Sequence, residues 1–298
     1  MAGMTDRIFG DIPGHPPGSI FADRAELHET GVHRPLQAGI SGSATEGADS
    51  IVLSGGYEDD EDHGDLIIYT GSGGRDQQTG TQTHDQPFAG RTRALAFSCM
   101  NGLPVRVIRG STHDSVHSPP YGYSYDGLYL VEKYWHEPGR SGFRVWRFRL
   151  VEIPSISNRQ REEPGAVSEE QGAYNVPAGR HREQTTALIV RNTLLAVSLK
   201  RLYKYSCQMC SVRLECPAGP YAEAAHIRPL GSPHYGPDVI GNMICLCPNH
   251  HVLFDNGAIS VEKNLSLIGA TGDLWVHRKH GIGREFLRYH REHYLTDP

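Results

Sequence analysis

Residues 53–64 read Leu-Ser-Gly-Gly-Tyr-Glu-Asp-Asp-Glu-Asp-His-Gly and residues 69–76 read Tyr-Thr-Gly-Ser-Gly-Gly-Arg-Asp, and these two stretches decide the fold of the first half of the chain. Each begins where a short apolar run ends, and then turns polar and glycine-rich, which is typical of loops between β-strands. The apolar, β-branched and aromatic runs are Ser50–Leu53, Leu66–Thr70, Val105–Arg109, Leu128–Trp135 and Phe143–Ile153. With one helix expected near Arg91–Met100, this pattern predicts a barrel or a strongly curved sheet over residues 5–153.

The length of the chain favours two domains. Its 298 residues exceed what one compact core usually holds. Residues 154–183 are rich in Glu, Gln, Ser, Arg, Pro and Gly without a sustained period, which indicates a linker. We therefore expect an α+β protein with one domain over residues 1–153 and a second over residues 184–298. The second domain is expected to contain helices over Gln184–Tyr205 and Gly283–Leu295.

Charge is distributed unevenly along the sequence. Residues 1–183 carry 17 Lys and Arg against 25 Asp and Glu, and residues 184–298 carry 12 against 9. Binding of a polyanion would therefore depend on a few placed cations rather than on a basic field. The sequence has no run that approaches the ~20 apolar residues of a membrane span, and its first ten residues lack the apolar region of a signal peptide. We expect a soluble, cytoplasmic protein with no membrane partner.

Five of the six cysteines fall between residues 207 and 247. In a reducing compartment such a cluster binds metal more often than it forms disulfides. Two knuckles, each with two ligands three residues apart, supply the four ligands of a closed tetrahedral zinc site: Cys207, Cys210, Cys247 and His250. Two other cysteines remain alternative ligands, Cys245 first and Cys216 second.

Three polar residues lie among these knuckles: His226 in the run Ala-Ala-His-Ile, then Asn242, and then His251 directly after the second knuckle. This order resembles the HNH (ββα-metal) nuclease family over about residues 200–260. The resemblance implies that His226 is the general base, that Asn242 orients it and that His251 is catalytic. His251 and Asp255 are four residues apart on a helix, so together they can hold Mg²⁺ or Mn²⁺. Many family members have a further metal ligand where this chain has Ala225.

The stretches at residues 53–64 and 69–76, together with residues 9–14, 125–129 and 141–146, resemble the SRA (SET- and RING-associated) domain, which is known for binding 5-methylcytosine in DNA. The resemblance covers nearly all of residues 7–150 and implies a pocket for a cytosine flipped out of the duplex. Tyr57 and Tyr69 would supply two aromatic faces. Asp60 would accept a hydrogen bond from the exocyclic amine, and Thr70 would contact a second edge position. Small residues would leave space for a C5 substituent: Ser54, Gly55 and Gly56.

Outside the pocket, three residues are expected to contact DNA: Gln37, Arg75 and Gln82. Arg75 would contact a phosphate, which positions the protein without reading sequence. Of the acidic run Glu58–Asp62, we expect only Asp60 to reach the pocket and the other four residues to be solvated. The loop at residues 77–83 is short and uncharged, whereas eukaryotic SRA domains carry a longer basic one. A preference for hemimethylated CpG therefore does not transfer, and 5-hydroxymethylcytosine stays open as a second modified base.

Joined in one chain, the two resemblances predict a modification-dependent, type IV-like restriction endonuclease, similar to the bacterial SRA–HNH enzymes. Its partner would be double-stranded DNA that contains modified cytosine, and its cofactors a structural Zn²⁺ and a catalytic Mg²⁺ or Mn²⁺. One HNH site cuts one strand, so a double-strand break favours a homodimer. Two alternatives stay open. One is a non-catalytic reader of modified DNA, which Ala225 favours, and the other is a base-excision glycosylase, which would need a catalytic acid or nucleophile in the first domain.

Overall fold

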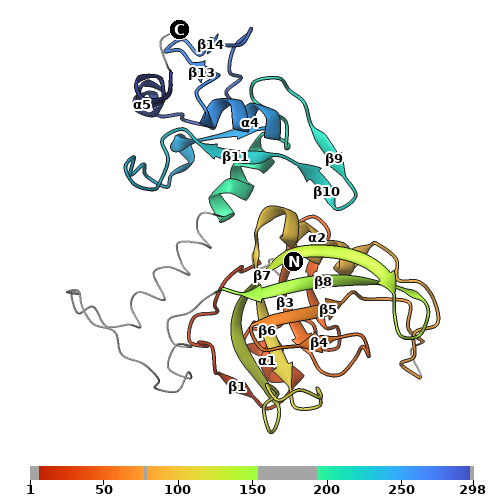
Figure 1. The fold of residues 1–298 in the computed structure, drawn as a ribbon. Helices are drawn as coiled ribbons and strands as arrows, with labels where there is room; N and C mark the ends of the chain where they lie inside the picture. The colour runs from red at the N-terminus through yellow and green to blue at the C-terminus, as the bar shows by residue number, and fades with distance from the viewer. Residues whose placement is uncertain (1–6, 77–78, 154–192, 296–298) are drawn as a thin grey trace, which may run out of the picture. The chain divides into compact units, whose positions relative to one another are not determined.

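The computed structural model describes residues 7–76, 79–153 and 193–295 (Figure 1). The chain divides into two compact units, Met1–Val190 and Arg191–Pro298. The expected linker, residues 154–183, and the beginning of the helix expected over Gln184–Tyr205 lie outside the described residues. Within the described ranges, no helix combines the length and the apolar character needed to cross a bilayer.

The first unit is built on one sheet of eight strands (Figure 1). Its elements are β1 (Ile20–Phe21), α1 (Arg24–Glu29), β2 (Ile40–Ser43), β3 (Gly47–Leu53), β4 (Glu61–Asp62), β5 (Leu66–Thr70), α2 (Gly90–Asn101), β6 (Pro104–Gly110), β7 (Tyr123–Pro138) and β8 (Arg144–Glu152). The strand order is β2-β3-β6-β7-β8-β5-β4, with β1 paired to β7. Strands β3 and β6 are parallel, and the other neighbouring pairs are antiparallel. The strand-rich α+β class predicted from the sequence is confirmed.

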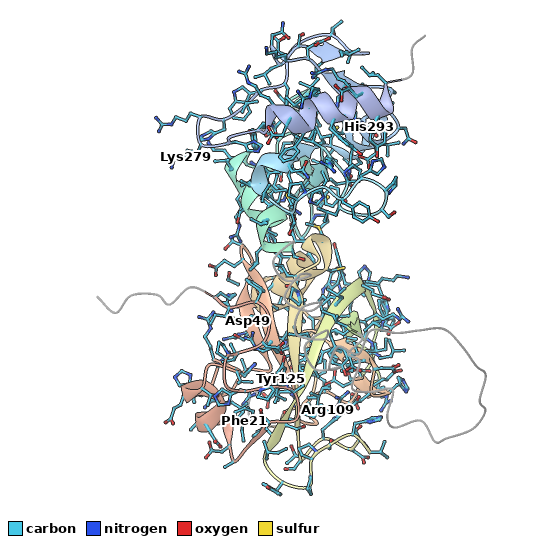
Figure 2. All side chains as sticks on the ribbon, turned by 90° about the vertical axis from the view of Figure 1, so that its left-hand side faces the viewer. Phe21, Asp49, Arg109, Tyr125, Lys279 and His293 are labelled. Atoms are coloured by element: carbon cyan, nitrogen blue, oxygen red, sulfur yellow. The ribbon has the colours of Figure 1, made fainter. Side chains whose placement is uncertain are left out.

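The centre of this sheet is buried. Every residue of β3 and of β6 is buried, which is typical of strands that are covered on both faces. Helix α2 packs against β2, β3 and β7, and it ends at Gly102, whose φ of 63° suits a glycine at a helix C-terminus. Phe21 and Tyr125 (Figure 2) belong to an apolar cluster that ties β1 and α1 to the sheet. The loops at the strand ends therefore start from a rigid platform.

An ion pair attaches the acidic run to the sheet. Arg109 of β6 (Figure 2) donates to both carboxylate oxygens of Asp62, at 2.7 and 2.8 Å. Burial opposes ionisation of Asp62, but the contacts with Arg109 prevail and lower its pKa to about 2. Asp59 is also buried, and it accepts a hydrogen bond from the backbone N of Arg140 at 2.8 Å. The expectation of a solvated run is therefore wrong for Asp59 and Asp62, because these donors replace the lost water.

The second unit contains short strands and helices around a small core. Residues 193–202 form a helix, which is the described part of the helix expected over Gln184–Tyr205. The elements that follow are β9 (Leu214–Cys216), β10 (Gly219–Tyr221), β11 (Glu223–His226), the 3-10 turn η2 (Ile240–Asn242), β12 (Met243–Leu246), α4 (Pro248–Asp255), β13 (Ser260–Val261), β14 (Leu267–Ile268) and α5 (Arg284–Tyr294). The closing helix predicted over Gly283–Leu295 is present as α5.

A ββα arrangement lies at the centre of this unit (Figure 1). Strands β11 and β12 pair antiparallel, with Ala225 opposite Ile244 and His226 opposite Met243. Helix α4 follows β12 at once and has proline in its first turn, where the missing N–H costs nothing. The core consists of buried side chains from the hairpin and both helices, among them Ala225, Ile227, Ile244, Phe254 and Leu287. Ala225 thus points into the core.

Candidate functional site

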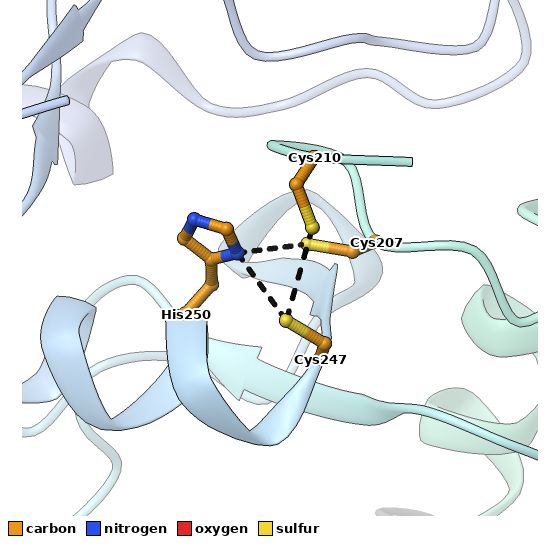
Figure 3. A group of neighbouring side chains, drawn as sticks. All are labelled: Cys207, Cys210, Cys247 and His250. Atoms are coloured by element: carbon orange, nitrogen blue, oxygen red, sulfur yellow. Dashed lines mark hydrogen bonds between the residues drawn. The ribbon is translucent and has the colours of Figure 1, made fainter. Parts of the chain in front are cut away.

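Four predicted metal ligands come together where the segment before β9 meets the start of α4 (Figure 3). Their ligand atoms all lie within 4.8 Å of one another: Cys207, Cys210, Cys247 and His250. The Sγ atoms of Cys210 and Cys247 are 3.9 Å apart, and Nδ1 of His250 is 3.6 Å from Sγ of Cys207. Tetrahedral bonds of ~2.3 Å to sulfur and ~2.0–2.1 Å to nitrogen imply separations of about 3.8 and 3.5 Å. The four side chains fit a closed tetrahedral metal site.

The alternative cysteines lie outside this cluster. Cys245 is fully buried on β12, and burial raises the pKa of its thiol to about 12. Cys216 lies on β9. In the described part of the chain, neither thiol belongs to a group of side chains close enough together to bind one metal ion. Gln208 is buried between the two cysteines of the first knuckle, where it accepts from the backbone N of Cys245 at 2.7 Å and donates to Trp275 O at 2.8 Å. This amide fastens the knuckle to β12.

A cavity of about 420 Å³ opens among β11, α4 and α5. His226, at the end of β11, and His251, in α4, both line it, so two of the predicted catalytic residues face one space. The complete lining is Ala224, His226, Ile227, Pro229, His251, Asp255, His290 and Tyr294. A space of this size, with three imidazoles and a carboxylate, can hold a phosphodiester group and a small cation.

His226 is held by a carboxylate that sequence reasoning missed. Its Nε2 lies 3.3 Å from Oδ1 of Asp238, and the two side chains are 24% and 12% exposed. Because a carboxylate only accepts, Nε2 carries the hydrogen in this pair and Nδ1 is the nitrogen that can take a proton from water. Asp238 lies in a loop, 12 residues after His226, and no motif in the sequence marks it.

The side chain of Asn242 makes contacts other than the one expected with His226. Its side chain is fully buried and bonds to the backbone of the loop that follows His226: it accepts from Arg228 N at 2.9 Å and donates to Arg228 O and Pro237 O, both at 2.8 Å. Among the described residues, these hydrogen bonds reach backbone groups and not the imidazole of His226. Asn242 therefore fixes the loop that carries Asp238, and Asp238 contacts the histidine.

His251 lies between two carboxylates. Its Nδ1 is 2.6 Å from Oε2 of Glu223, and its Nε2 is 3.2 Å from Oδ2 of Asp255. The hydrogen bond with Asp255 is the largest cause of a raised pKa of His251, and Glu223 adds to it while burial opposes it. Glu223 was missed in the sequence, where the only sign of it is one acidic residue in the apolar run before His226. The predicted cation ligands His251 and Asp255 are thus neighbours.

The predicted base pocket contains Asp60, a half-buried residue whose carboxyl group is desolvated. Oδ1 of Asp60 accepts from the backbone N of Thr70 at 2.8 Å. Burial raises the pKa of Asp60 to about 7, although the hydrogen bonds of Thr70 and the charge of Arg147 favour ionisation. Tyr69 is only 3% exposed, and its hydroxyl lies 3.4 Å from Val52 O. The structure therefore brings Asp60, Thr70 and Tyr69 together at the end of β5.

Arg147 of β8 is a further residue that sequence reasoning missed. It is 4% exposed, donates to Oγ1 of Thr70 at 3.2 Å and contacts Asp59 O. The same guanidinium forms an ion pair with Glu61 at 2.5 Å. A cation in this position holds both segments of the pocket and offsets the charge of Asp60. Only tertiary pairing of β5 with β8 reveals it, because position 147 lies in an ordinary strand.

Tyr57 and Arg75 stack on each other near Asp60. The guanidinium of Arg75 lies 4.7 Å from the centre of the Tyr57 ring, and its Nε donates to Gly80 O. The hydroxyl of Tyr57 accepts from Gly73 N at 3.1 Å. Gly55, one of the small residues predicted beside the base, has a φ of +70°, a conformation that favours glycine. The two diagnostic stretches of sequence are thus joined in space.

The other predicted DNA contacts differ in exposure. Gln37 is exposed, and two residues later the chain passes so close to Tyr69 that a Cβ on Gly39 would lie 2.6 Å from its hydroxyl. Gln82 is only 8% exposed, and its amide donates to His84 O at 2.6 Å and to Gly73 O at 3.2 Å. In this structure Gln82 therefore holds the loop that carries Arg75, whereas Gln37 faces solvent near the pocket.

Comparison with known families divides the chain in the same way. Residues 8–155 match the SAD/SRA domain, and residues 207–262 match the HNH endonuclease domain. Among curated proteins, the E3 ubiquitin-protein ligase UHRF1 of Bos taurus is 45% identical over 184 residues, which are 54% of this chain and 22% of that protein. The ligase ORTHRUS 2 of Arabidopsis thaliana is 45% identical over 159 residues, 48% of this chain and 25% of that protein. This chain therefore spans about a quarter or less of these relatives.

One solved structure is similar over nearly the whole length. The modification-dependent restriction endonuclease TagI is 42% identical, with a TM-score of 0.82, and the match covers 99% of this chain and 98% of that one. Both units and their order are thus shared with a single known protein. The likeness to TagI and the two family matches show that this chain belongs to the modification-dependent restriction endonucleases, DNA endonucleases in which an SAD/SRA domain precedes an HNH domain.

Proposed function

We propose that this endonuclease binds 5-methylcytosine flipped out of double-stranded DNA and hydrolyses a nearby phosphodiester bond. The observation that carries the proposal is the carboxyl group of Asp60, buried beside Tyr57 and Tyr69, both of which its charge affects. Desolvation of this acid is costly, and the charge of Arg147 offsets it only in part, so such a group indicates a ligand that needs it. The residues expected to do this form one domain over 1–153, and those expected to cut form another over 184–298.

Recognition of cytosine follows from the charge of the acid. The backbone of Thr70 bonds Oδ1 of Asp60, so Oδ2 can accept from the exocyclic amine of a flipped cytosine. Thymine presents a carbonyl oxygen at that position, and two acceptors would repel each other. Stacking on Tyr57 and Tyr69 offsets the few kcal/mol of a lost base stack. The small residues Ser54, Gly55 and Gly56 would leave room for a methyl group on C5. 5-Hydroxymethylcytosine is a second candidate ligand.

Hydrolysis would begin at His226. Its Nε2–H donates to Asp238, and Nδ1 takes the proton of the attacking water, so the imidazolium that forms lies beside a carboxylate. A divalent ion, Mg²⁺ or Mn²⁺, would polarise the phosphoryl oxygen and stabilise the leaving 3′ oxygen. His251 and Asp255 would hold that ion, since both line the cavity that His226 faces. Asn242 would act as a positioning residue through the loop that carries Asp238.

The Cys and His cluster would hold a structural Zn²⁺. Thiolate and imidazole ligands in a closed tetrahedron are the typical set for zinc, and no ligand position is left for water or substrate. Burial is the main cause of a pKa of about 11 for Cys210, and the neighbouring thiol of Cys207 adds to it. A bound cation reverses this effect and keeps the thiolates ionised. The metal would thus stabilise the ββα fold rather than take part in hydrolysis.

DNA placement and cutting of both strands require further contacts. Arg75 lies at the surface loop beside the pocket and would contact a phosphate, and Gln37 would enter the space left by the flipped base. One HNH site cuts one strand, so we propose a homodimer for double-strand cleavage. The alternative of a non-catalytic reader rests on Ala225, which is fully buried in the core. The contact of Glu223 with His251 weakens that alternative, because it supports a proposed ligand of the cation.

A plasmid assay tests the proposal. Unmodified plasmid and plasmid methylated at cytosine are incubated with the protein in Mg²⁺ or Mn²⁺, beside the variant His226→Ala and the control His293→Ala, which alters an exposed histidine outside the cavity. We expect cleavage of methylated plasmid by the wild type and by the control, and none by His226→Ala. Equal cleavage of both plasmids would contradict coupling of recognition to cutting. Binding of methylated DNA without cleavage in either metal would favour the reader.

A further inference from the structure

We propose that Glu223 is a positioning residue that fixes the ring of His251, so that Nε2 of the imidazole and the carboxylate of Asp255 present a preformed pair of ligands to the divalent ion. The inference rests on the proposed function. It assigns a role to the acidic residue of β11 that lies 28 positions before His251 and contacts it at 2.6 Å.

The two contacts of His251 have different lengths, and these lengths distinguish a second metal ligand from a hydrogen-bond partner. Two ligands of one octahedral cation, each at ~2.1 Å, are about 3.0 Å apart when they are adjacent. The distance of 3.2 Å between His251 Nε2 and Asp255 Oδ2 fits a hydrogen bond and also lies near such an edge. The distance of 2.6 Å between His251 Nδ1 and Glu223 Oε2 is too short for it and fits a charge-assisted hydrogen bond. Glu223 is therefore a hydrogen-bond partner of His251 and not a second ligand beside it.

The hydrogen bond to Glu223 decides which nitrogen of His251 can bind a cation. A carboxylate only accepts, so Nδ1 must carry the hydrogen. In the neutral ring Nε2 then has the lone pair, and it is the nitrogen on the side of Asp255. Without Glu223 the hydrogen can move to Nε2, where Asp255 would attract it and the metal-binding position would be blocked. Such outer carboxylates typically affect metal affinity about 10- to 100-fold.

Glu223 is itself held in place from a second side. The hydroxyl of Tyr221 donates to Oε1 at 2.6 Å, while Oε2 contacts the imidazole. Both oxygens therefore have partners in the structure, and neither is directed to the cation. The charge of Glu223 also acts on Lys200, a residue with a 6% exposed side chain in the helix of residues 193–202. Glu223 is thus connected to β10, to α4 and to the first helix of the unit.

This arrangement explains why position 225 does not carry a metal ligand. Ala225 packs in the core opposite Ile244, so a carboxylate there would be buried without a partner. Glu223 reaches the same site through His251 and does not need to enter the core. The cation site then consists of His251, Asp255 and oxygen atoms of water or phosphate, which suits Mg²⁺ and Mn²⁺, since both keep several such ligands.

The test uses the zinc-loaded full chain and measures Mn²⁺ binding without DNA by electron paramagnetic resonance. Glu223→Gln keeps the shape of the side chain, Glu215→Gln is the control at an exposed acid of β9, and His251→Ala removes a ligand. We expect Glu223→Gln to weaken Mn²⁺ binding about 10- to 100-fold, with a larger loss for His251→Ala and no change for the control. Nitrogen-15 spectra should show the Nδ1–H form of His251 in the wild type and a mixture in Glu223→Gln.

Two outcomes would overturn the inference while the proposed function stands. The first is wild-type Mn²⁺ affinity and an unchanged His251 tautomer in Glu223→Gln. The second is a loss of Mn²⁺ as complete as that of His251→Ala, which would make Glu223 a direct ligand. Failure of the proposed function is a separate result, since the wild type would then neither bind Mn²⁺ nor cut methylated DNA. Affinity for methylated DNA should be equal in all variants, because the pocket lies in the other unit.

Discussion

The proposed base pocket and the proposed cleavage site are built in opposite ways. In the proposed pocket, Asp60 accepts a hydrogen bond from the backbone N of Thr70, and Oγ1 of Thr70 accepts one from the buried Arg147, so the shape of the pocket needs no added group. In the proposed cleavage site, His226 ends the four-residue strand β11 and His251 and Asp255 lie on the short helix α4, which begins at the Cys and His cluster. We infer that the proposed base pocket is preorganised by its fold, whereas the second unit needs bound cations to hold its thiols and carboxylates together.

The largest expected effect comes from the Cys and His cluster proposed to bind zinc, because loss of its metal should affect the second unit and not the first. Replacing Cys247 by serine removes one of four ligands, and structural zinc contributes about 10 kcal/mol or more, comparable to the whole stability of a small domain. We expect Cys247→Ser to lose bound zinc and cleavage, while its affinity for methylated DNA changes little. Zinc content, plasmid cleavage and fluorescence anisotropy measure the three quantities.

Cys216→Ser is the matched control for this prediction, since Cys216 lies outside the cluster. It should keep zinc and cleavage. If Cys247→Ser still cut methylated plasmid at the wild-type rate, the claim that the second unit depends on its metal would be wrong. If methylated-DNA binding were lost together with zinc, the two units would not be independent.

The second effect concerns the acid of the pocket. Asp60→Ala removes a hydrogen bond to a charged group, worth about 1.5–3 kcal/mol, so the affinity for methylated DNA should fall about 10- to 100-fold. Cleavage at saturating DNA should change less, because His226 and His251 lie in the other unit. Glu58→Ala is the control, since Glu58 is the exposed acid two positions before Asp60. Equal losses in the two variants would show a general charge effect in place of base recognition.

The sequence revealed these two regions to different degrees. Tyr57, Asp60 and Thr70 stand in two nearby stretches whose glycines and aromatic residues are diagnostic, so the pocket could be predicted from them. Arg147 and Glu223 could not, because each acts through a partner that only strand pairing or helix packing brings near. Asn242 shows the same limit. Its position was predicted, but its amide forms hydrogen bonds with backbone groups, and the residue that contacts His226 is Asp238.

A smaller effect is expected from pH, and its sign follows from Asp60. The pKa of about 7 in the folded protein lies above the ordinary 3.8, so the stability that the neutral acid contributes is full below about pH 4 and is lost as pH rises through 7. Binding has the opposite sign, because the ionised acid accepts from cytosine more strongly. Affinity for methylated DNA should therefore rise between pH 6 and 8, by less than the loss in Asp60→Ala.

Anisotropy titrations at constant salt measure this dependence, with Asp60→Asn as the control that cannot ionise. A flat profile for Asp60→Asn and a rising one for the wild type are expected. If both rose equally, the titrating group would lie elsewhere, and if the wild-type affinity fell over this range, the assignment of Asp60 as an acceptor would be wrong.

The smallest effect is expected at Arg75, and it separates phosphate binding from base recognition by the proposed pocket. Its guanidinium lies over Tyr57, but its role on DNA would be a phosphate contact, which carries no base information. Arg75→Ala should weaken the binding of methylated and of unmodified DNA by the same factor, about 3- to 10-fold. It should also reduce the slope of log Kd against log salt concentration by about one unit. Kd measured against salt for both DNAs tests this. A loss confined to methylated DNA would instead place Arg75 in base recognition through Tyr57, because an undirected phosphate contact cannot distinguish the two duplexes.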